Sequence, residues 1–444
     1  MSDLEELAGW GRFPRLPCRV AKPADEAGVA EALATGPAIA RGMGRAYGDS
    51  ALGPGTVVDM RGQNRFLDFD AETGLVTVEA GVVLADVIAT FLPRGWFPPV
   101  TPGTKFVSIG GMIASDVHGK NHHRDGSFGA FVAWLDLMGP DGTVRRCSPQ
   151  ENAELFAHTV GGMGLTGVIL RAAFRLRRVE SAWIRQEMVV CPDLDAAMAA
   201  FEAHGERTYS VAWIDCLASG AALGRSLLML GEHAVAADLD GDKARAPFEV
   251  PRKGRKKVPF DAPGWTLNKF SVKAFNEVYY RAGKRKAGVE LVDWDSYFYP
   301  LDAILEWNRI YGRRGFVQFQ CVIPTARARD GMRALLEAIS AAGAGSFLAV
   351  LKRLGAQESA VSFPMDGYTL ALDFPVSAKV LTLVDRLDAI TLEHGGRFYL
   401  AKDARMTAET LRRSDARWGE MSALRAREGL AARVQSMQSV RLTL

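Results

Sequence analysis

A glycine-rich stretch at residues 40–50 is the part of the sequence that most constrains the fold. It reads Ala40-Arg41-Gly42-Met43-Gly44-Arg45-Ala46-Tyr47-Gly48-Asp49-Ser50, and we call it the glycine loop. Glycine allows a positive φ angle and a close approach of the backbone to a ligand. Successive exposed backbone N–H groups form a concave site for anions such as a pyrophosphate. With short strands expected on both sides, the stretch alone predicts either a tight turn or an anion-binding loop.

A second segment of small residues ends in a histidine. Residues 101–104 and 108–119 include Gly110, Gly111 and Ser115, and His118 stands near the end of the segment. Small side chains let such a segment lie flat against a large planar ligand, but they also let a helix pack closely on a sheet. Both interpretations are open at this point.

A third glycine cluster, residues 162–167, matches the pattern G-x-G-x-x-G. In a dinucleotide-binding fold this motif follows a strand and opens a helix. Here a predicted helix at residues 151–160 precedes it, and a predicted strand at residues 168–176 follows it. The cluster therefore indicates a glycine turn at the C-terminal end of a helix.

Length and composition favour a folded protein of two domains. The chain has 444 residues, which is too long for one compact core. Its net charge of +3 is small, and its five cysteines are dispersed without a C-x-x-C pair, which indicates reduced thiols. The acidic N-terminus lacks the hydrophobic segment of a secretory signal, and no apolar run reaches the roughly 20 residues that span a bilayer. We expect a cytoplasmic protein, or one peripheral at the inner membrane.

From about residue 185 the pattern changes to that of an α+β domain with an antiparallel sheet. Strands are expected at residues 209–215, 226–230, 316–323, 347–351 and 368–374, and helices at 326–342 and 379–394. The strand at 316–323 alternates and places Gln318 and Gln320 on one face. Two amides on one strand face form a polar ligand surface if they are enclosed.

A long polar and basic region, residues 238–286, interrupts this domain. It contains the run from Arg252 to Lys257 and a second cluster, Lys284-Arg285-Lys286, with Trp265, Phe270 and Phe275 between them. Such a region usually forms a solvated loop, but it also suits contact with an anionic membrane or a phosphate-bearing lipid. Nucleic acid is not expected, because the charge elsewhere is nearly balanced.

The remaining motifs give no sign of a metal site or of a hydrolase. His118 and His122 have a spacing that suits zinc on a helix, but neither cysteine nor an H-E-x-x-H pattern accompanies them. We therefore expect no metal. A G-x-S-x-G nucleophile motif is also missing from the sequence.

The order of these segments resembles a known family. It is carried by Gly9-Trp10-Gly11-Arg12, the glycine loop, His118-Gly119-Lys120-Asn121-His122-His123, Gly126-Ser127-Phe128-Gly129, residues 161–167, Glu306-Trp307-Asn308 and residues 399–403. The chain is similar to FAD-binding oxidoreductases of the vanillyl-alcohol oxidase type, with the PCMH-type FAD-binding fold. Within that group it most resembles the family of decaprenylphosphoryl-ribose 2′-oxidases.

The resemblance implies an α+β, two-domain fold and an FAD site. Residues 1–182 would form the FAD-binding domain, 183–396 an antiparallel-sheet substrate domain, and 397–444 a segment that completes the first domain. The glycine loop would hold the pyrophosphate. The rest of the cofactor would contact Gly103, Ser108, Ile109, Gly110, Gly111, Ser115, Asp116, Val117, His118, Ile169 and Tyr399. Relatives that bind FAD covalently carry Gly-His-Ser where this chain has Gly44-Arg45-Ala46, so we expect non-covalent FAD.

The resemblance also implies the substrate pocket and its chemistry. Substrate would contact His118, Lys120, Trp213, Gln318, Gln320, Lys352 and Lys402, with Tyr47 and Lys402 as catalytic residues. A lysine beside the flavin stabilises its developing negative charge, and it acts as a base only if burial lowers its pKa. Close relatives carry a cysteine where this chain has Ala371, and the aromatic hydroxyls fall differently around Tyr297 and Tyr299.

The expected reaction is oxidation of the 2′-hydroxyl of a polyprenylphosphoryl ribose to a ketone in cell wall biosynthesis. A separate keto-reductase would complete the epimerisation, and a membrane quinone would accept the electrons. Family resemblance also makes a periplasmic position an expectation, although the sequence shows no export signal. The alternatives are an aldonolactone or alditol oxidase acting on a small polyol, and a flavin-binding protein without turnover.

Overall fold

The structure is a computed structural model that describes residues 4–251, 254–264, 266–346 and 348–444. Arg252, Lys253, Trp265 and Phe347 therefore lie outside the described residues. The first two belong to the predicted basic run, and Phe347 is the predicted start of a strand.

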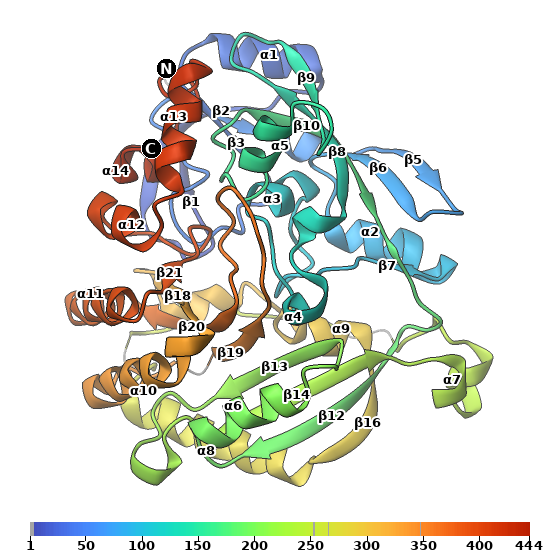
Figure 1. The fold of residues 1–444 in the computed structure, drawn as a ribbon, viewed down its shortest axis with the longest axis vertical. Helices are drawn as coiled ribbons and strands as arrows, with labels where there is room; N and C mark the ends of the chain where they lie inside the picture. Colours follow the sequence, from blue (N-terminus) through green and yellow to red (C-terminus); the bar gives the residue numbers. More distant parts are fainter. Residues whose placement is uncertain (1–3, 252–253, 265, 347) are drawn as a thin grey trace.

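Two sheets form the part of the molecule drawn in the upper half of Figure 1. One has the strand order β1 (Leu4–Ala8), β2 (Arg15–Ala21), β4 (Thr56–Asp59) and β3 (Ala38–Arg41). The other has the order β5 (Phe66–Asp70), β6 (Leu75–Glu79), β10 (Val168–Arg175), β8 (Val132–Met138) and β9 (Val144–Cys147). The helices in this part are α1 (Glu26–Ala34), α2 (Leu84–Phe91), α3 (Ile109–Ala114), α4 (His122–Asp125) and α5 (Ala153–Thr159).

The predicted glycine turn is confirmed between α5 and β10. Gly161, Gly164 and Gly167 all have positive φ angles, of 81°, 77° and 141°. A Cβ atom on Gly162 would lie 1.9 Å from the carbonyl oxygen of His158, at the end of the helix. The cluster therefore serves to stop α5 and to lead the chain into β10, as expected for glycines at a helix C-terminus.

The C-terminal segment lies against the first sheet (Figure 1). It contains α12 (Ala408–Ser414), α13 (Trp418–Arg427) and α14 (Met437–Leu442). The backbone N–H of Ala38 donates to the carbonyl of Arg433 at 2.8 Å, and that of Gln435 donates back to Ala38 at 3.0 Å. The end of the chain thus supports the strand that leads into the glycine loop. The division of the chain into domains at 182/183 and 396/397 remains a prediction.

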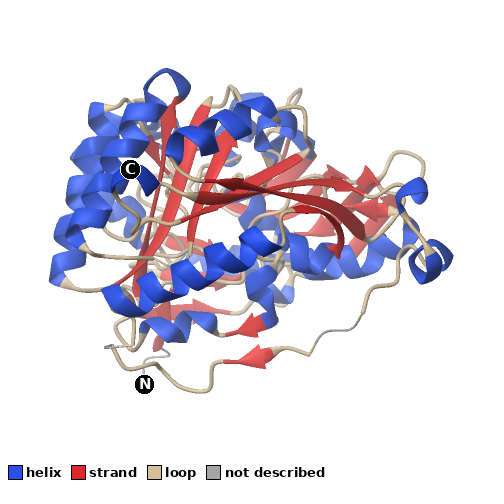
Figure 2. Ribbon diagram, turned by 90° about the horizontal axis from the view of Figure 1, so that it is seen from below, coloured by secondary structure: helices blue, strands red, loops and turns tan. Residues whose placement is uncertain are grey.

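An eight-stranded antiparallel sheet forms the other large layer (Figure 1). Its order is β16 (Gly288–Asp293), β12 (Trp183–Cys191), β14 (Ser226–His233), β13 (Tyr209–Ile214), β19 (Ala349–Leu354), β20 (Gly367–Pro375), β18 (Phe316–Pro324) and β21 (Arg397–Phe398). Helices α6 (Leu194–Ala203), α10 (Thr325–Ala342) and α11 (Ala378–Glu393) pack against it, and Figure 2 shows helices lying along its long strands.

The two faces of this sheet differ in character because side chains alternate along a strand. In β18, Phe319 and Cys321 join the hydrophobic core under α6, α10 and α11. In β20, Leu370, Leu372 and Phe374 do the same. The intervening residues therefore face away from the helices, toward the glycine loop. This alternation decides which side chains of the sheet can reach a ligand.

The prediction that residues 238–286 form a solvated loop is wrong for its second half. Residues Lys269–Arg285 form helix α8, and a short helix, α7 (Gly241–Arg245), precedes it. Asn268 begins α8 by accepting hydrogen bonds from the backbone N–H groups of Phe270 and Ser271 at 2.8 and 3.1 Å, as an N-cap residue does. Only Val272, Asn276 and Gly283 of the helix are buried, so its apolar period is weak in the sequence.

Within the described residues, none of the helices combines the length and the apolar character needed to cross a bilayer.

Candidate active site

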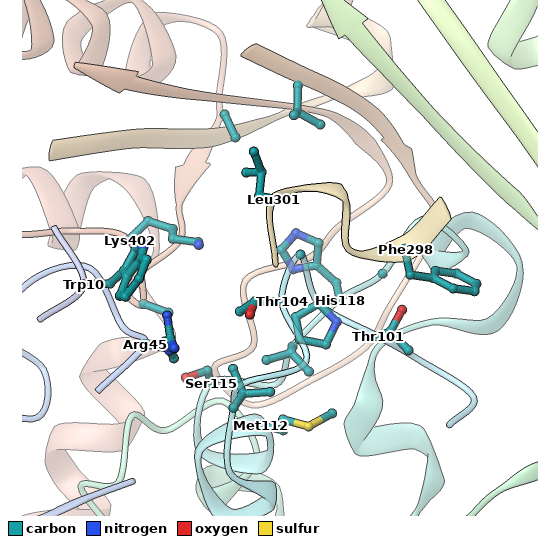
Figure 3. A pocket seen from close by; sticks show the side chains of 18 of the residues that line it. Trp10, Arg45, Thr101, Thr104, Met112, Ser115, His118, Phe298, Leu301 and Lys402 are labelled. Carbon is teal, nitrogen blue, oxygen red and sulfur yellow. The ribbon is translucent and has the colours of Figure 1, made fainter. Parts of the chain in front are cut away.

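A cavity of about 740 Å³ lies between the glycine loop, the segment around α3 and the free face of the eight-stranded sheet. We call it the central cavity. Figure 3 shows Lys402 and His118 directed into the same space, with Arg45 and Trp10 along one wall. The predicted site residues that line it are Ala40, Gly42, Met43, Gly44, Arg45, Ala46, Tyr47, Ser50, Gly103, Ser108, Gly110, Gly111, Ser115, Val117, His118, Lys120, Ile169, Trp213, Gln318, Gln320, Lys352, Tyr399 and Lys402.

The glycine loop joins two parallel strands, β3 and β4, so it is not a tight turn between antiparallel neighbours. A Cβ atom on Gly42 would lie 1.9 Å from Oγ of Ser108. One on Gly44, whose φ is +62°, would lie 2.4 Å from the guanidinium of Arg41. These contacts require glycine at both positions and leave the backbone bare where it meets the cavity.

Arg45 supplies positive charge beside this bare backbone. Its guanidinium stacks over the ring of Trp10 at 4.0 Å and over that of Phe106 at 5.6 Å. Burial lowers the pKa of Arg45 from its usual value, and the carboxylate of Asp302 acts in the opposite direction. The side chain is thus held in place by two rings while its charge faces the cavity.

The segment around α3 serves both purposes that the sequence left open. A Cβ atom on Gly110 would lie 2.9 Å from Cβ of Ala80, so this glycine lets α3 pack against the chain below it. Gly111 would meet only Oγ of Ser108, at 3.0 Å, and Gly103 has nothing within 4 Å of the same position. The cavity side of the segment is therefore flat and open.

Five residues predicted to bind cofactor do not line the central cavity, namely Arg41, Gly48, Asp49, Ile109 and Asp116. Arg41 points away from it and donates to the carbonyl oxygens of Ala8 and Ala51, at 2.7 and 3.2 Å. Asp116 accepts hydrogen bonds from Ser127 and from the N–H of Gly129.

The other three also support the wall from behind. Ile109 belongs to the hydrophobic core. Asp49 accepts two hydrogen bonds from Arg441, and a Cβ atom on Gly48 would lie 2.1 Å from the carbonyl oxygen of Asp403. Glycine patterns and small size cannot distinguish such residues from ligand contacts, because both need close backbone approach.

The predicted histidine cluster is spread over three separate contacts. Nε2 of His118 lies 3.1 Å from Nε2 of Gln320. Nε2 of His122 lies 2.8 Å from Oε1 of Gln357, and that of His123 lies 2.8 Å from the carbonyl of Arg207. Of these three, only His118 lines the cavity. Its Nδ1 is buried without a hydrogen-bond partner among the described residues, so it is available to a ligand.

Three buried lysines give the cavity a positive interior. Burial lowers the pKa of Lys352 to about 8. Burial, together with Lys352, lowers the pKa of Lys120 to about 7. Lys120 also donates to the carbonyl of Tyr297 and lies 4.1 Å from the centre of its ring. Such lysines are costly to bury unless an anion compensates them.

Lys402 is the third of these lysines, and it lies next to the other predicted catalytic residue. Its Nζ atom is 3.8 Å from the centre of the Tyr47 ring. Burial raises the pKa of Tyr47 well above its usual value, so the phenol keeps its proton. Burial lowers the pKa of Lys402, while the carboxylate of Asp373 acts in the opposite direction. The two side chains come from segments that are far apart in the sequence and meet here.

Sequence reasoning missed several residues of the cavity, of which Asp373 is the most important. It lies on the free face of β20, is 1% exposed, and lines the cavity. A single acid inside the apolar strand Gly367–Pro375 was the available signal. Met163, Gly164 and Gly167 of the glycine turn also line the cavity, as does Trp10.

These features fit FAD. The bare backbone of the glycine loop and the guanidinium of Arg45 suit a pyrophosphate. The open glycines at positions 103 and 111 leave room for a flat ring system, and the unpartnered Nδ1 of His118 offers it a polar contact. The individual roles of these residues toward FAD remain predictions.

Comparison with known proteins supports this fit. A model of the FAD binding domain matches residues 17–148. The chain is 38% identical over 419 residues to the decaprenylphosphoryl-beta-D-ribose oxidase of Mycolicibacterium smegmatis, which covers 91% of this chain and 90% of that protein. It is 33% identical to an uncharacterised protein of Streptomyces coelicolor, over 72% of this chain and 88% of that one.

A more distant similarity is confined to the N-terminal domain of a different oxidase. The L-gulonolactone oxidase of Mus musculus is 35% identical over 129 residues, which is 29% of each chain. The long match to the ribose oxidase, the FAD-binding domain and the fitting cavity agree with one another. The chain therefore belongs to the decaprenylphosphoryl-β-D-ribose oxidase family, and it is an FAD-dependent oxidoreductase of α+β fold that acts on CH–OH groups.

Proposed function

We propose that this enzyme oxidises the 2′-hydroxyl of a polyprenylphosphoryl ribose to a ketone. The single observation that carries the proposal is the composition of the central cavity. Its inner part holds Lys120, Lys352 and Lys402, and its outer part reaches Tyr279 and Gly283 of helix α8. A substrate with a sugar, a phosphate and a lipid chain needs such a sequence of polar, cationic and apolar surfaces.

The buried lysines suit a phosphate-bearing substrate better than a neutral sugar. The described residues that line the cavity include two carboxylates, Asp373 and Glu290, against these three lysines. Glu290 is exposed and lies on the edge strand β16. The remaining positive charge favours an anionic ligand. Gln318 and Gln320, on the neighbouring strand, can hydrogen-bond sugar hydroxyls.

The chemistry divides between the cofactor and the chain. When bound, FAD supplies the oxidant that accepts a hydride from carbon. The chain orients the alcohol and manages its proton: neutral Lys402 can accept it, and protonated Tyr47 can donate a hydrogen bond to the same oxygen. We assign both residues to the reacting hydroxyl, because their side chains are in contact and both line the cavity.

We also propose that the FAD is held without a covalent bond. The position at which covalently flavinylated relatives carry histidine is Arg45 here, and its guanidinium is stacked on Trp10. After acid precipitation of the protein, the flavin should stay in the supernatant. Yellow flavin that stays with the washed pellet would contradict this.

Helix α8 offers a surface for an anionic membrane, where the lipid substrate and a quinone acceptor would be found. Phe270 is 82% and Val278 is 68% exposed. Lysines and an arginine flank them at Lys269, Lys273, Lys284, Arg285 and Lys286. Exposed apolar side chains among basic ones are typical of helices that lie on a membrane surface. The exposed Tyr279 also lines the cavity, so this surface adjoins its opening.

Replacing the apolar part of this surface should weaken membrane binding. The double variant Phe270→Ser/Val278→Ser is expected to bind vesicles containing anionic lipid about tenfold or more weakly, because each side chain loses its burial in the bilayer. Co-sedimentation with vesicles measures this. Leu67→Ser, at an exposed apolar residue of β5, is the matched control and should bind as wild type does. Equal binding of the double variant would remove α8 from the membrane surface.

Anaerobic titration tests the substrate proposal. Addition of a polyprenylphosphoryl ribose should bleach the flavin absorbance, and free polyols or aldonolactones should not. Bleaching by polyols alone would favour the polyol oxidase, and bleaching by neither would indicate a flavin-binding protein without turnover. In the proposed scheme a separate keto-reductase consumes the ketone.

A further inference from the structure

Asp373 faces the reacting part of the cavity, although the sequence gave no reason to assign it a role. It lies opposite Gln318 in the pairing of β20 with β18. Nε2 of Gln318 donates to Oδ1 of Asp373 at 2.5 Å, and the backbone N–H of Asp373 donates to Oγ of Ser346 at 3.1 Å. These bonds fix the carboxylate on the cavity side of the sheet.

The groups around Lys402 make Asp373 its natural counter-charge. Lys402 faces Tyr47 from the glycine loop, Lys352 from β19, His118 from the segment after α3, and Asp373 from β20. Among the described residues that line the cavity, the other carboxylate, Glu290, is separated from β20 by four strands of the sheet. Asp373 is therefore the buried negative charge that the cavity places near Lys402.

We propose that Asp373 is a positioning residue that stabilises the protonated form of Lys402 during the reaction. This step rests on the proposed function. The O–H bond of the substrate alcohol breaks as a N–H bond forms on the neutral amine of Lys402. The hydride of the same carbon, with its electron pair, leaves to FAD as oxidant. The ammonium so formed is stabilised by the carboxylate across the cavity.

The charges in the cavity support this assignment. Burial lowers the pKa of Lys402, Lys352 lowers it further, and Asp373 raises it. Tyr311 also faces Asp373, and it stays protonated because burial raises its pKa. The pKa of Lys352, by contrast, is lowered by burial alone. Removal of the Asp373 charge should therefore lower the pKa of Lys402 and leave that of Lys352 nearly unchanged.

A labelling experiment on the FAD-loaded protein tests this without substrate. Acetic anhydride modifies neutral amines, so the rate of acetylation as a function of pH, followed by mass spectrometry, gives the pKa of each lysine. In Asp373→Asn the pKa of Lys402 should fall by about one unit or more, while that of Lys352 serves as internal reference. In Asp373→Glu the pKa of Lys402 should stay near the wild-type value. Flavin absorbance confirms that each variant is folded and loaded.

The matched control is Asp388→Asn. Asp388 is also a buried acid, but it pairs with Arg405 outside the central cavity. If the pKa of Lys402 is the same in Asp373→Asn as in wild type, or falls equally in Asp388→Asn, the proposal is wrong. Where the polyprenylphosphoryl ribose bleaches the flavin, the acidic limb of the rate of reduction should also move to lower pH in Asp373→Asn. Failure of that substrate to bleach the wild-type flavin would overturn the proposed function, and the labelling result would still decide the role of Asp373.

Discussion

Lys402→Ala should bind FAD normally and reduce it about 10²–10⁴-fold more slowly with substrate, the range expected when a general base is lost. The side chain contacts the ring of Tyr47 and faces the cavity, whereas the glycine loop and Arg45 lie in another part of the wall. Removing the amine therefore removes the proton acceptor without disturbing the expected pyrophosphate contacts. Stopped-flow measurement of anaerobic flavin reduction gives the rate.

The matched control for this variant is Lys352→Ala. It removes a second buried lysine of the same cavity, which we assign to binding rather than to proton transfer. It should raise the substrate concentration needed for half-maximal reduction more than it lowers the maximal rate. A wild-type rate of reduction in Lys402→Ala would show that the catalytic assignment is wrong.

Arg441→Ala should lower the free energy of unfolding by about 3 kcal/mol, because it leaves buried carboxylates without their cation. The guanidinium of Arg441 lies 2.7 Å from Asp49 of the glycine loop and 2.8 Å from Asp403. The two carboxylate side chains are 5% and 7% exposed. This network ties α14 to the loop, so FAD affinity should fall together with stability. Denaturant titration followed by flavin release measures both effects.

The same network predicts the pH dependence of the loss. Burial opposes ionisation of Asp403, but Arg441 and the backbone N–H groups of Arg405 and Met406 outweigh it and lower the pKa of Asp403. A lowered pKa in the folded state stabilises the protein above the ordinary pKa of aspartate, and this contribution is lost as the pH falls through the lowered value. The difference between wild type and Arg441→Ala should therefore be largest near neutral pH and should shrink in acid.

A surface pair gives the control for Arg441. Arg413 and Glu409 on α12 lie 3.8 Å apart, and their side chains are 63% and 78% exposed. Arg413→Ala should change the free energy of unfolding by less than about 1 kcal/mol, because exposed ion pairs contribute little. Equal losses in Arg413→Ala and Arg441→Ala would contradict the role assigned to the buried network.

The sequence predicts the parts of the site that depend on local pattern. Alternation along residues 316–323 places Gln318 and Gln320 on one face, and the structure has both on the cavity side of β18. Glycine spacing likewise indicates the loop at residues 40–50, although it does not tell a wall residue such as Gly42 from a supporting one such as Gly48. That distinction depends on what packs behind the loop, which comes from the other end of the chain.

The parts that the sequence does not predict depend on long-range topology. Asp373 acquires its environment from Gln318, Tyr47 and Lys402, which lie on other segments and meet it only through the order of strands. Helix α8 was missed for a different reason: its exposed face carries Phe270 and Val278, so polar and apolar residues do not separate with a helical period. A surface that would bind a membrane hides the pattern by which a soluble helix is recognised.

The most direct test of the central claim is a kinetic isotope effect on flavin reduction by a polyprenylphosphoryl ribose. Oxidation at the 2′-hydroxyl requires that the C2′–H bond breaks as hydride leaves. Deuterium at C2′ should therefore slow anaerobic reduction several-fold, and deuterium at C3′ should leave the rate unchanged. A slower rate with deuterium at C3′ and none with deuterium at C2′ would contradict the proposed reaction.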